Sequence, residues 1–371
     1  MKKISLAMAA SLLLAGNAVA ENSFEKAFKD GTVSGDITLH AERQNNSGSN
    51  KDAGFSMGSV NLGFETAQLN GFKLTFGFRG NHDFSEVEDG DFESLGEVSE
   101  QTDALLHTAT ISYTNQYFNL SVGRQEVDLE WLSDYHEAAV LGITAIPDTT
   151  VVFGVTRRIA IADEDAALDN FHDFGKNDSG EDIDFAAVLD VKYEGIEGLV
   201  LNPYFYDADN LAKWYGLKVD YDTDLFGVTL HGAQSDIENL SEDGEIYHLE
   251  GRLNLANVGL KLGYISTDKD QGAGYMDSLG DNISPFEDGN QVYEADADTT
   301  YFSLGYEIAG VELGALYGKT EYGSNEEKEL NLTVDYNITE SISLGALYVD
   351  VNAQDSDDDY NRFGLTLQYT F

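Results

Sequence analysis

The last twelve residues of the chain, 360–371, read YNRFGLTLQYTF. Apolar side chains occupy every second position from Phe363 to Phe371, and small or polar side chains stand between them. A period of two is the pattern of a β-strand with one apolar and one polar face. A strand of this kind that ends on a terminal aromatic residue is typical of a β-barrel that closes in a membrane. Soluble β-sandwiches contain such strands too, so the interpretation depends on how often the pattern recurs.

The same alternation recurs along the whole chain. In residues 72–79, for example, four apolar side chains alternate with Lys73, Thr75, Gly77 and Arg79. Many of these segments have about the 9–11 residues with which a tilted strand crosses a bilayer. We therefore predict an all-β fold, a transmembrane antiparallel β-barrel of about 18 strands. The expected strands lie near residues 33–42, 60–64, 72–79, 108–114, 118–123, 138–145, 150–158, 185–194, 199–206, 212–221, 225–234, 246–255, 258–266, 300–307, 311–319, 329–336, 341–350 and 361–371.

The connections between these strands alternate in length. Odd-numbered strands are generally followed by long polar segments, such as 82–103, 126–137, 159–184 and 268–298. Even-numbered strands are followed by tight turns, such as 145–149, 195–198, 222–224, 256–257 and 337–340. This is the arrangement of outer-membrane barrels, which have long extracellular loops and short periplasmic turns. An even number of strands places both termini on the periplasmic side.

Aromatic residues mark the end of the barrel that carries the short turns. At the membrane surface such residues form a girdle. Just before the first strand, Phe24, Ala27 and Phe28 have helical spacing, which predicts one or two turns of amphipathic helix on the periplasmic side. The tyrosines expected in the girdle are Tyr113, Tyr193, Tyr221, Tyr336 and Tyr369.

The start of the chain has the three parts of a secretory signal peptide. Residues 1–20 begin with two lysines, continue with an apolar run and end in Ala18-Val19-Ala20. A membrane anchor is the alternative, but the apolar run is shorter than the roughly 18 residues that such a helix needs. We expect cleavage after residue 20, export to the outer membrane of a Gram-negative cell, and a single barrel domain over residues 21–371.

The composition limits the possible partners. The 371 residues carry a formal net charge of −46 and contain no cysteine. Phosphate binding needs a basic surface, so nucleic acid is excluded as a partner, while cations are natural ones. The absence of cysteine excludes disulfides, thiolate metal sites and a lipidated N-terminal cysteine. The expected partners are the lipid bilayer, small hydrophilic solutes and cations.

The polar face of the strands indicates the function. If the apolar face contacts lipid, the polar face lines the interior, and a barrel of 16–18 strands encloses an aqueous lumen. We therefore expect a water-filled channel in which rows of charged side chains act on a passing ion. The basic residues expected in this lining are Lys73, Arg79, Arg158, Lys192, Lys218, Arg252 and Lys261.

The third loop, residues 126–137, differs from the other loops because it mixes apolar anchors with spaced carboxylates. Leu129, Trp131 and Leu132 would not be needed in a solvated loop, so we expect the loop to fold back against the inner wall and narrow the pore. A cation-preferring constriction would follow. Its expected acidic side is Asp128, Glu130, Asp134 and Glu137, and the candidates for its basic side are Arg124, Arg157 and Arg158.

Other loops are strongly acidic, and two interpretations of them are open. Oxygen-rich clusters could bind Ca²⁺, with Asp163, Asp165, Asp178 and Asp182 as candidate ligands, although none matches an EF-hand loop. The alternative is a solvated acidic mouth that concentrates cations. No cofactor is required under either interpretation.

Two motifs carry a resemblance to a known family. Residues 23–31, SFEKAFKDG, are followed by Val33-Ser34-Gly35, and Val122-Gly123-Arg124-Gln125 opens the third loop. These resemble the Opr-type porins, which include porin D of pseudomonads and the major outer membrane porins of Campylobacter-like bacteria. The resemblance implies an eighteen-stranded barrel, often a homotrimer, that passes small charged solutes by diffusion. The family's arginine in the Gly-Arg-Gln motif corresponds to Arg124.

Three functions other than that of a general porin are compatible with parts of the sequence. A substrate-specific amino-acid or carboxylate channel is disfavoured because Thr38 stands where many family members have arginine, and because the basic residues are sparse. A surface adhesin or structural barrel without conductance is a second alternative. An enzyme is disfavoured because the seven histidines are scattered and no Gly-x-Ser-x-Gly motif occurs.

Overall fold

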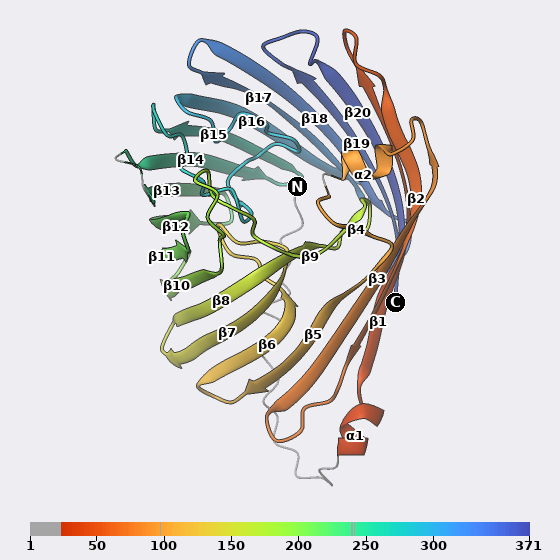
Figure 1. Cartoon of the computed structure of the whole chain (residues 1–371), viewed down its shortest axis with the longest axis vertical. Helices are drawn as coiled ribbons and strands as arrows, with labels where there is room; N and C mark the ends of the chain where they lie inside the picture. The colour runs from red at the N-terminus through yellow and green to blue at the C-terminus, as the bar shows by residue number, and fades with distance from the viewer. Residues whose placement is uncertain (1–23, 97, 239, 241) are drawn as a thin grey trace.

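The computed structural model describes residues 24–96, 98–238, 240 and 242–371 (Figure 1). The expected signal peptide, residues 1–20, lies outside these residues. Within them, no α-helix has the length and apolar character needed to cross a bilayer.

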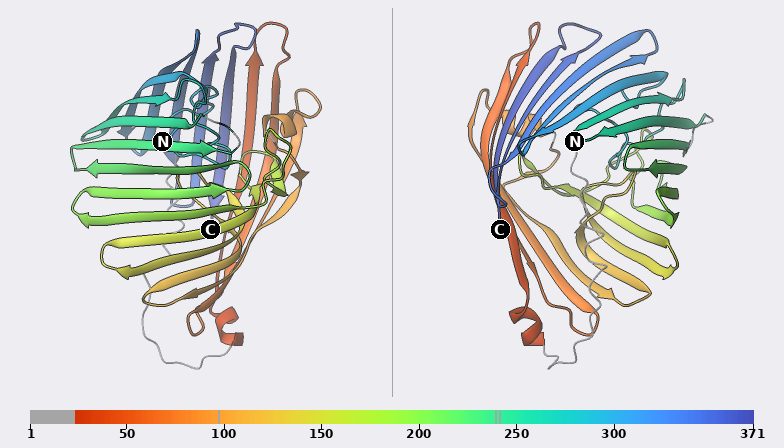
Figure 2. Two further views of the ribbon diagram at one scale, coloured as in Figure 1. Left: turned by 60° about the vertical axis from the view of Figure 1, so that its left-hand side comes forward. Right: turned by 180° about the vertical axis from the view of Figure 1, so that it is seen from behind.

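Eighteen long antiparallel strands form a closed barrel, as predicted (Figures 1 and 2). Each expected segment corresponds to one of them. They are β1 (Thr32–Asn46), β2 (Ala53–Glu65), β3 (Phe72–Glu86), β5 (Ala104–Thr114), β6 (Phe118–Glu126), β7 (Tyr135–Ile146), β8 (Thr149–Ile161), β10 (Ala186–Ile196), β11 (Leu199–Ala208), β12 (Ala212–Asp222), β13 (Phe226–Ile237), β14 (Gly244–Leu255), β15 (Val258–Thr267), β16 (Ala297–Ile308), β17 (Val311–Tyr322), β18 (Asn325–Asn337), β19 (Ile342–Asn352) and β20 (Tyr360–Thr370).

The barrel closes between its first and last strands. β1 pairs with β20 from Asp36 opposite Thr370 to Asn46 opposite Tyr360. Every other long strand pairs with its neighbours in chain order, so β3 pairs with β5 and β8 pairs with β10. Closure leaves no unpaired strand edge, which is required of a sheet in lipid because no water is present there to satisfy backbone groups.

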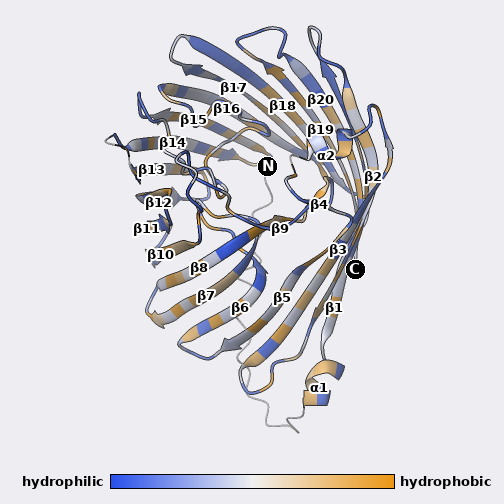
Figure 3. Cartoon of the chain, in the orientation of Figure 1, coloured by the Kyte–Doolittle hydropathy of each residue, from blue (hydrophilic) through white to orange (hydrophobic). Residues whose placement is uncertain are grey.

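The two faces of the barrel differ in polarity. Val60, Leu62 and Leu262 are more than half exposed on the outside, while Asp36 and Thr38 lie on the inner face of β1 and are buried. Apolar and polar residues alternate along the strands in Figure 3. At the end with the short turns, three of the five expected girdle tyrosines lie against other outer rings. The pairs Phe72–Tyr113 and Tyr221–Phe226 are tilted, and Tyr369–Phe371 is stacked.

Two short strands and two short helices are not part of the barrel wall. β4 (Gln101–Thr102) pairs with β9 (Leu168–Asp173), and this pairing joins the loop after β3 to the loop after β8. Figure 1 shows β4 and β9 within the ring of long strands. α2 (Asp91–Leu95) lies in the loop after β3, and its Phe92 packs against Phe55 and Met57 of β2 and Ala167 of the loop after β8. α1 (Phe24–Lys29) precedes β1. Two connections expected to be extracellular, 209–211 and 323–324, are as short as the periplasmic turns.

The closing strand provides a test of which face contacts lipid. Leu365 is exposed on the outer face in the middle of β20, whereas Thr366 faces His40 across the β1–β20 pair. Arginine on the lipid face near the bilayer centre costs about 2–4 kcal/mol. We expect Leu365→Arg to lower the urea midpoint of the barrel refolded in lipid vesicles, read as heat-modifiable migration on a gel. Thr366→Arg should have a smaller effect, and equal losses would contradict the assignment of faces.

Candidate functional site

The third loop is a compact hairpin inside the barrel. The Val127 N–H donates to the Asp134 carbonyl over 2.8 Å, and Leu129 and Leu132 form a bridge. The side chains of Val127, Trp131 and Leu132 are almost fully buried. The loop is therefore held by apolar contacts along its length.

Polar contacts join this loop to the inner wall at β11 and β12. The Trp131 indole N–H donates to the Tyr204 hydroxyl over 2.8 Å, and that hydroxyl lies 2.6 Å from Nε2 of His231. Glu130 forms a 2.8 Å ion pair with Lys218. Glu130 was expected on the acidic side of the constriction, but the structure buries it under the loop, where the ammonium group compensates its charge.

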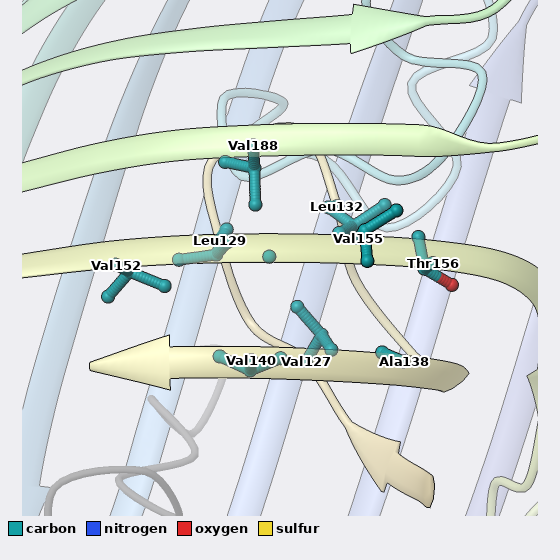
Figure 4. Close-up of a pocket in the computed structure, with 10 residues that line it drawn as sticks. Val127, Leu129, Leu132, Ala138, Val140, Val152, Val155, Thr156 and Val188 are labelled. Carbon is teal, nitrogen blue, oxygen red and sulfur yellow. The ribbon is translucent and has the colours of Figure 1, made fainter. Parts of the chain in front are cut away.

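The wall beneath the third loop is apolar on its inner face. Ala138, Val140, Val152 and Val188 belong to β7, β8 and β10, and with the loop they surround a cavity of about 10 Å³ (Figure 4). Such a volume is near the minimum for one water molecule. The inner face was expected to be polar throughout, and it departs from this pattern here because the loop, rather than water, covers the wall.

The seventh loop, residues 268–296, also folds into the barrel, although its acidic sequence predicted a solvated mouth or a calcium site. Met276, Leu279, Ile283, Phe286 and Val292 are buried in one cluster with the third loop and the inner wall. The Ser133 N–H donates to the Leu279 carbonyl over 3.1 Å. The sequence feature that indicates this packing is the set of apolar residues spaced among the carboxylates of the seventh loop.

The tip of the seventh loop reaches strands near the end of the chain. One carboxylate of β18, Glu329, accepts the N–H groups of Glu287, Asp288 and Gly289 over 3.1, 3.1 and 2.8 Å. The Asp288 carboxylate also pairs with the Arg362 guanidinium of β20. The loop therefore runs across the interior from β15 to β20.

The fourth loop, residues 162–185, brings an acidic run against the wall at β3 and β20. The Asn81 amide donates to the carbonyls of Asp163 and Ala166 over 2.8 and 2.7 Å. Gln368 donates to the Glu164 carboxylate over 3.3 Å. The structure therefore places Asp163-Glu164-Asp165 inside the barrel, beside charged residues of the wall.

The four candidate calcium ligands do not form one group. Asp163 and Asp165 lie in the acidic run, Asp178 accepts a hydrogen bond from Tyr275, and Asp182 pairs with Lys176. In the part of the chain that the structure describes, no three His, Cys, Asp or Glu side chains are grouped to hold a metal ion. The structure thus offers no arrangement that favours calcium at these positions.

The expected basic side of the constriction is not formed by Arg124 and Arg158. Arg124 follows Val122 on the face of β6 opposite to Gln125, and it pairs over 3.0 Å with Glu137 of the adjacent strand. Arg158 lies 3.6 Å from the same carboxylate. These charges compensate one another within one patch of sheet, because a β-bulge at residues 156–159 changes the face to which Arg158 belongs. Arg157 lies within this bulge and is exposed.

The acidic run lies near two other arginines, which the sequence did not single out as a pair. Arg79 and Arg362 both act electrostatically on Asp165, and Arg79 acts on Asp163. Asp134 of the third loop also acts on Asp163. Carboxylates of the third and fourth loops and arginines of β3 and β20 thus share one region of the lumen, which we call the charged passage.

Most inner basic side chains are paired with carboxylates of the barrel or its loops. Of the seven expected lining residues, Arg158 is displaced to another face by the bulge in β8. The other six lie on inward faces of their strands: Lys73, Arg79, Lys192, Lys218, Arg252 and Lys261. The ion pairs are Lys73–Glu65 (2.7 Å), Arg79–Asp36 (3.0 Å), Lys192–Glu194 (3.3 Å), Lys218–Glu130 (2.8 Å), Arg252–Glu250 (2.9 Å) and Arg362–Glu42 (3.2 Å). The positive charge of the inner wall is therefore largely compensated.

Comparison with known proteins decides the family. A family model described as Gram-negative porin matches residues 5–359, almost the whole chain. The chain belongs to the Gram-negative porins. The expected outer-membrane location and the resemblance to Opr-type porins are thereby confirmed, and the protein is an outer-membrane channel for small solutes. Among curated proteins, none matches the chain significantly.

Solved structures share the fold of this porin at low sequence identity. The crystal structure of OccAB4 from Acinetobacter baumannii is 15% identical with a TM-score of 0.77, over 92% of this chain and 98% of that one. OccAB1 from the same species is 14% identical with a TM-score of 0.77, over 95% and 99%. OpdO from Pseudomonas aeruginosa is 14% identical with a TM-score of 0.76, over 94% and 98%. At this identity the likeness shows the fold alone.

Loss of the Trp131 side chain should loosen the packing of the third loop against the inner wall. Trp131→Ala removes a fully buried ring and its hydrogen bond to Tyr204, and such truncations cost about 3–5 kcal/mol. We expect a larger and noisier single-channel conductance in planar bilayers. Tyr247→Ala, which removes an exposed ring from the outer face, is the control and should leave conductance unchanged. An unaltered conductance in Trp131→Ala would show that the loop does not limit flow.

The charge of Asp163 should change with pH between about 4 and 7. Displacement of water by the surrounding protein, together with the charges of Asp134, Asp165 and Glu164, raises the pKa of Asp163 to about 7. Because its side chain is still exposed to the lumen, we expect a midpoint between the ordinary 3.8 and about 7. Protonation removes a negative charge, so cation preference should fall as the pH is lowered.

This pH dependence can be measured as the reversal potential in a KCl gradient from pH 8 to pH 4. Asp163→Asn should remove the step in the curve, whereas Asp173→Asn, at an exposed residue of the same loop, should retain it. A step that persists in Asp163→Asn would assign the titration to another group.

Proposed function

We propose that this porin is a water-filled, cation-preferring diffusion channel in which the third loop, with the fourth and seventh loops, narrows the passage. The observation that carries the proposal is the pairing of inner basic side chains with carboxylates. A guanidinium already bound by Asp36 or Glu42 attracts a passing anion weakly. The carboxylates of the charged passage then set the sign of the local field.

The same pairing argues against a channel specific for carboxylate solutes. Such a channel needs unpaired cationic side chains that bind the solute one after another as it moves through the pore. Here Arg79 is held by Asp36, and Arg362 is shared between Glu42 and Asp288. Neither the guanidinium of Arg79 on β3 nor that of Arg362 on β20 is therefore free to bind a solute. We also propose that the protein forms a homotrimer, as the resemblance to Opr-type porins implies.

Reversal potentials across a salt gradient test the selectivity. The wild-type channel should pass K⁺ in preference to Cl⁻. Replacing four carboxylates of the third and fourth loops, as Asp128→Asn, Asp134→Asn, Asp163→Asn and Glu164→Gln, should move the permeability ratio toward one. An unchanged ratio would remove these carboxylates from the selectivity filter.

A variant with three carboxylates replaced in another loop controls for the general acidity of the protein. Asp355, Asp357 and Asp358 are exposed in the loop between β19 and β20, and their replacement by asparagine should leave the ratio close to that of the wild type. An equal loss of selectivity in this control would assign the preference to the acidic mouth. Absence of conductance steps in the wild type would instead favour an adhesin or structural barrel.

A further inference from the structure

A short helix before the first strand continues the outer apolar surface of the barrel. Phe24 and Phe28 are four residues apart in α1 and lie on one side of it, with ring centroids 4.9 Å apart. Phe28 also stacks on Phe64, at 5.8 Å and an interplanar angle of 26°. Phe64 follows Val60 and Leu62 on the outer face of β2. The three rings therefore extend the lipid-facing surface beyond the wall of the barrel.

The helix is fixed to the barrel. The Ala67 N–H, in the turn between β2 and β3, donates to the Ala27 carbonyl over 2.9 Å, and the Ala27 side chain is buried. Gly31 connects the helix to β1 so closely to Phe64 that a Cβ there would lie 2.6 Å from the ring. These contacts place α1 at the end of the barrel with the short turns (Figures 1 and 2). The two rings thus have defined positions relative to the wall.

These rings are nevertheless largely uncovered by the residues that the structure describes. Phe24 is 64% exposed and Phe28 is 38% exposed. At about 100° per residue, Lys26 lies opposite the two rings, and Lys29 lies about 120° from their mean direction. A helix with aromatic rings on one side and lysines on the other is suited to a membrane surface, where rings enter the headgroup boundary and ammonium groups contact water and phosphates.

We propose that α1 is an interfacial anchor whose Phe24 and Phe28 rings insert into the periplasmic leaflet of the outer membrane. The occupant of this surface is phospholipid, because the rings are continuous with the lipid-facing belt through Phe64. The contact with the Ala67 N–H makes the anchor part of the barrel end, so it sets the depth of β1 to β3 in the bilayer. The inference rests on the outer-membrane location and is independent of ion selectivity.

Spin labelling tests the anchor directly, because the chain contains no cysteine. Phe24→Cys would carry a single nitroxide, and power saturation in phospholipid vesicles would compare its collisions with oxygen and with a water-soluble nickel chelate. We expect oxygen to dominate, as at Phe72→Cys, which labels an exposed outer ring of β3 near the same end of the barrel. Lys26→Cys, on the opposite side of the same helix, should be dominated by the nickel chelate.

Two results would overturn the proposal. One is a Phe24 label with the same nickel accessibility as the Lys26 label, which would place both sides of the helix in water. The other comes from Phe24→Trp, a variant without a label. Its added fluorescence, relative to the protein with only Trp131 and Trp214, should be lost in vesicles of lipid brominated near the headgroup. Retention of that fluorescence would place the ring outside the bilayer.

Discussion

The antiparallel pairing of β1 with β20 makes the sheet a closed ring, and the rest of the structure depends on this ring. Lipid contains no water that could bond to the free N–H and C=O groups of an open edge. Once the pairing from residue 36 to residue 46 is made, each strand has one face toward lipid and one toward the interior. The period of two in the sequence then becomes a difference between outside and inside.

The wide interior explains why so much of the chain folds back into it. Side chains alone do not fill a barrel of eighteen strands. The third and seventh loops supply Trp131, Met276 and Phe286, which pack against the inner wall. The inner wall is apolar where these loops lie, as at Val140 and Val188, and charged in the passage beside Arg79. The loops thus divide the lumen into a packed part and a charged part.

The charges inside the barrel are arranged in pairs. Lys218 serves to hold the third loop through Glu130, and Arg362 holds the seventh loop through Asp288. Lys218, which the sequence predicts in the pore lining, therefore also has a structural role, as does Arg362. The proposed cation preference depends on acidic groups such as Asp163 and Asp134, because they lie close enough to act on one another electrostatically in the charged passage.

The sequence by itself determined the strands, their number, their two faces and the family, because alternation and turn lengths are local properties. It also indicated that Trp131 and its neighbours would be buried. Only the tertiary structure decided which charges meet, because pairs such as Arg79 with Asp36 and Arg362 with Asp288 come from distant segments. A β-bulge of one residue was enough to move Arg158 to a different face. Register and loop packing are long-range properties, and residue spacing does not contain them.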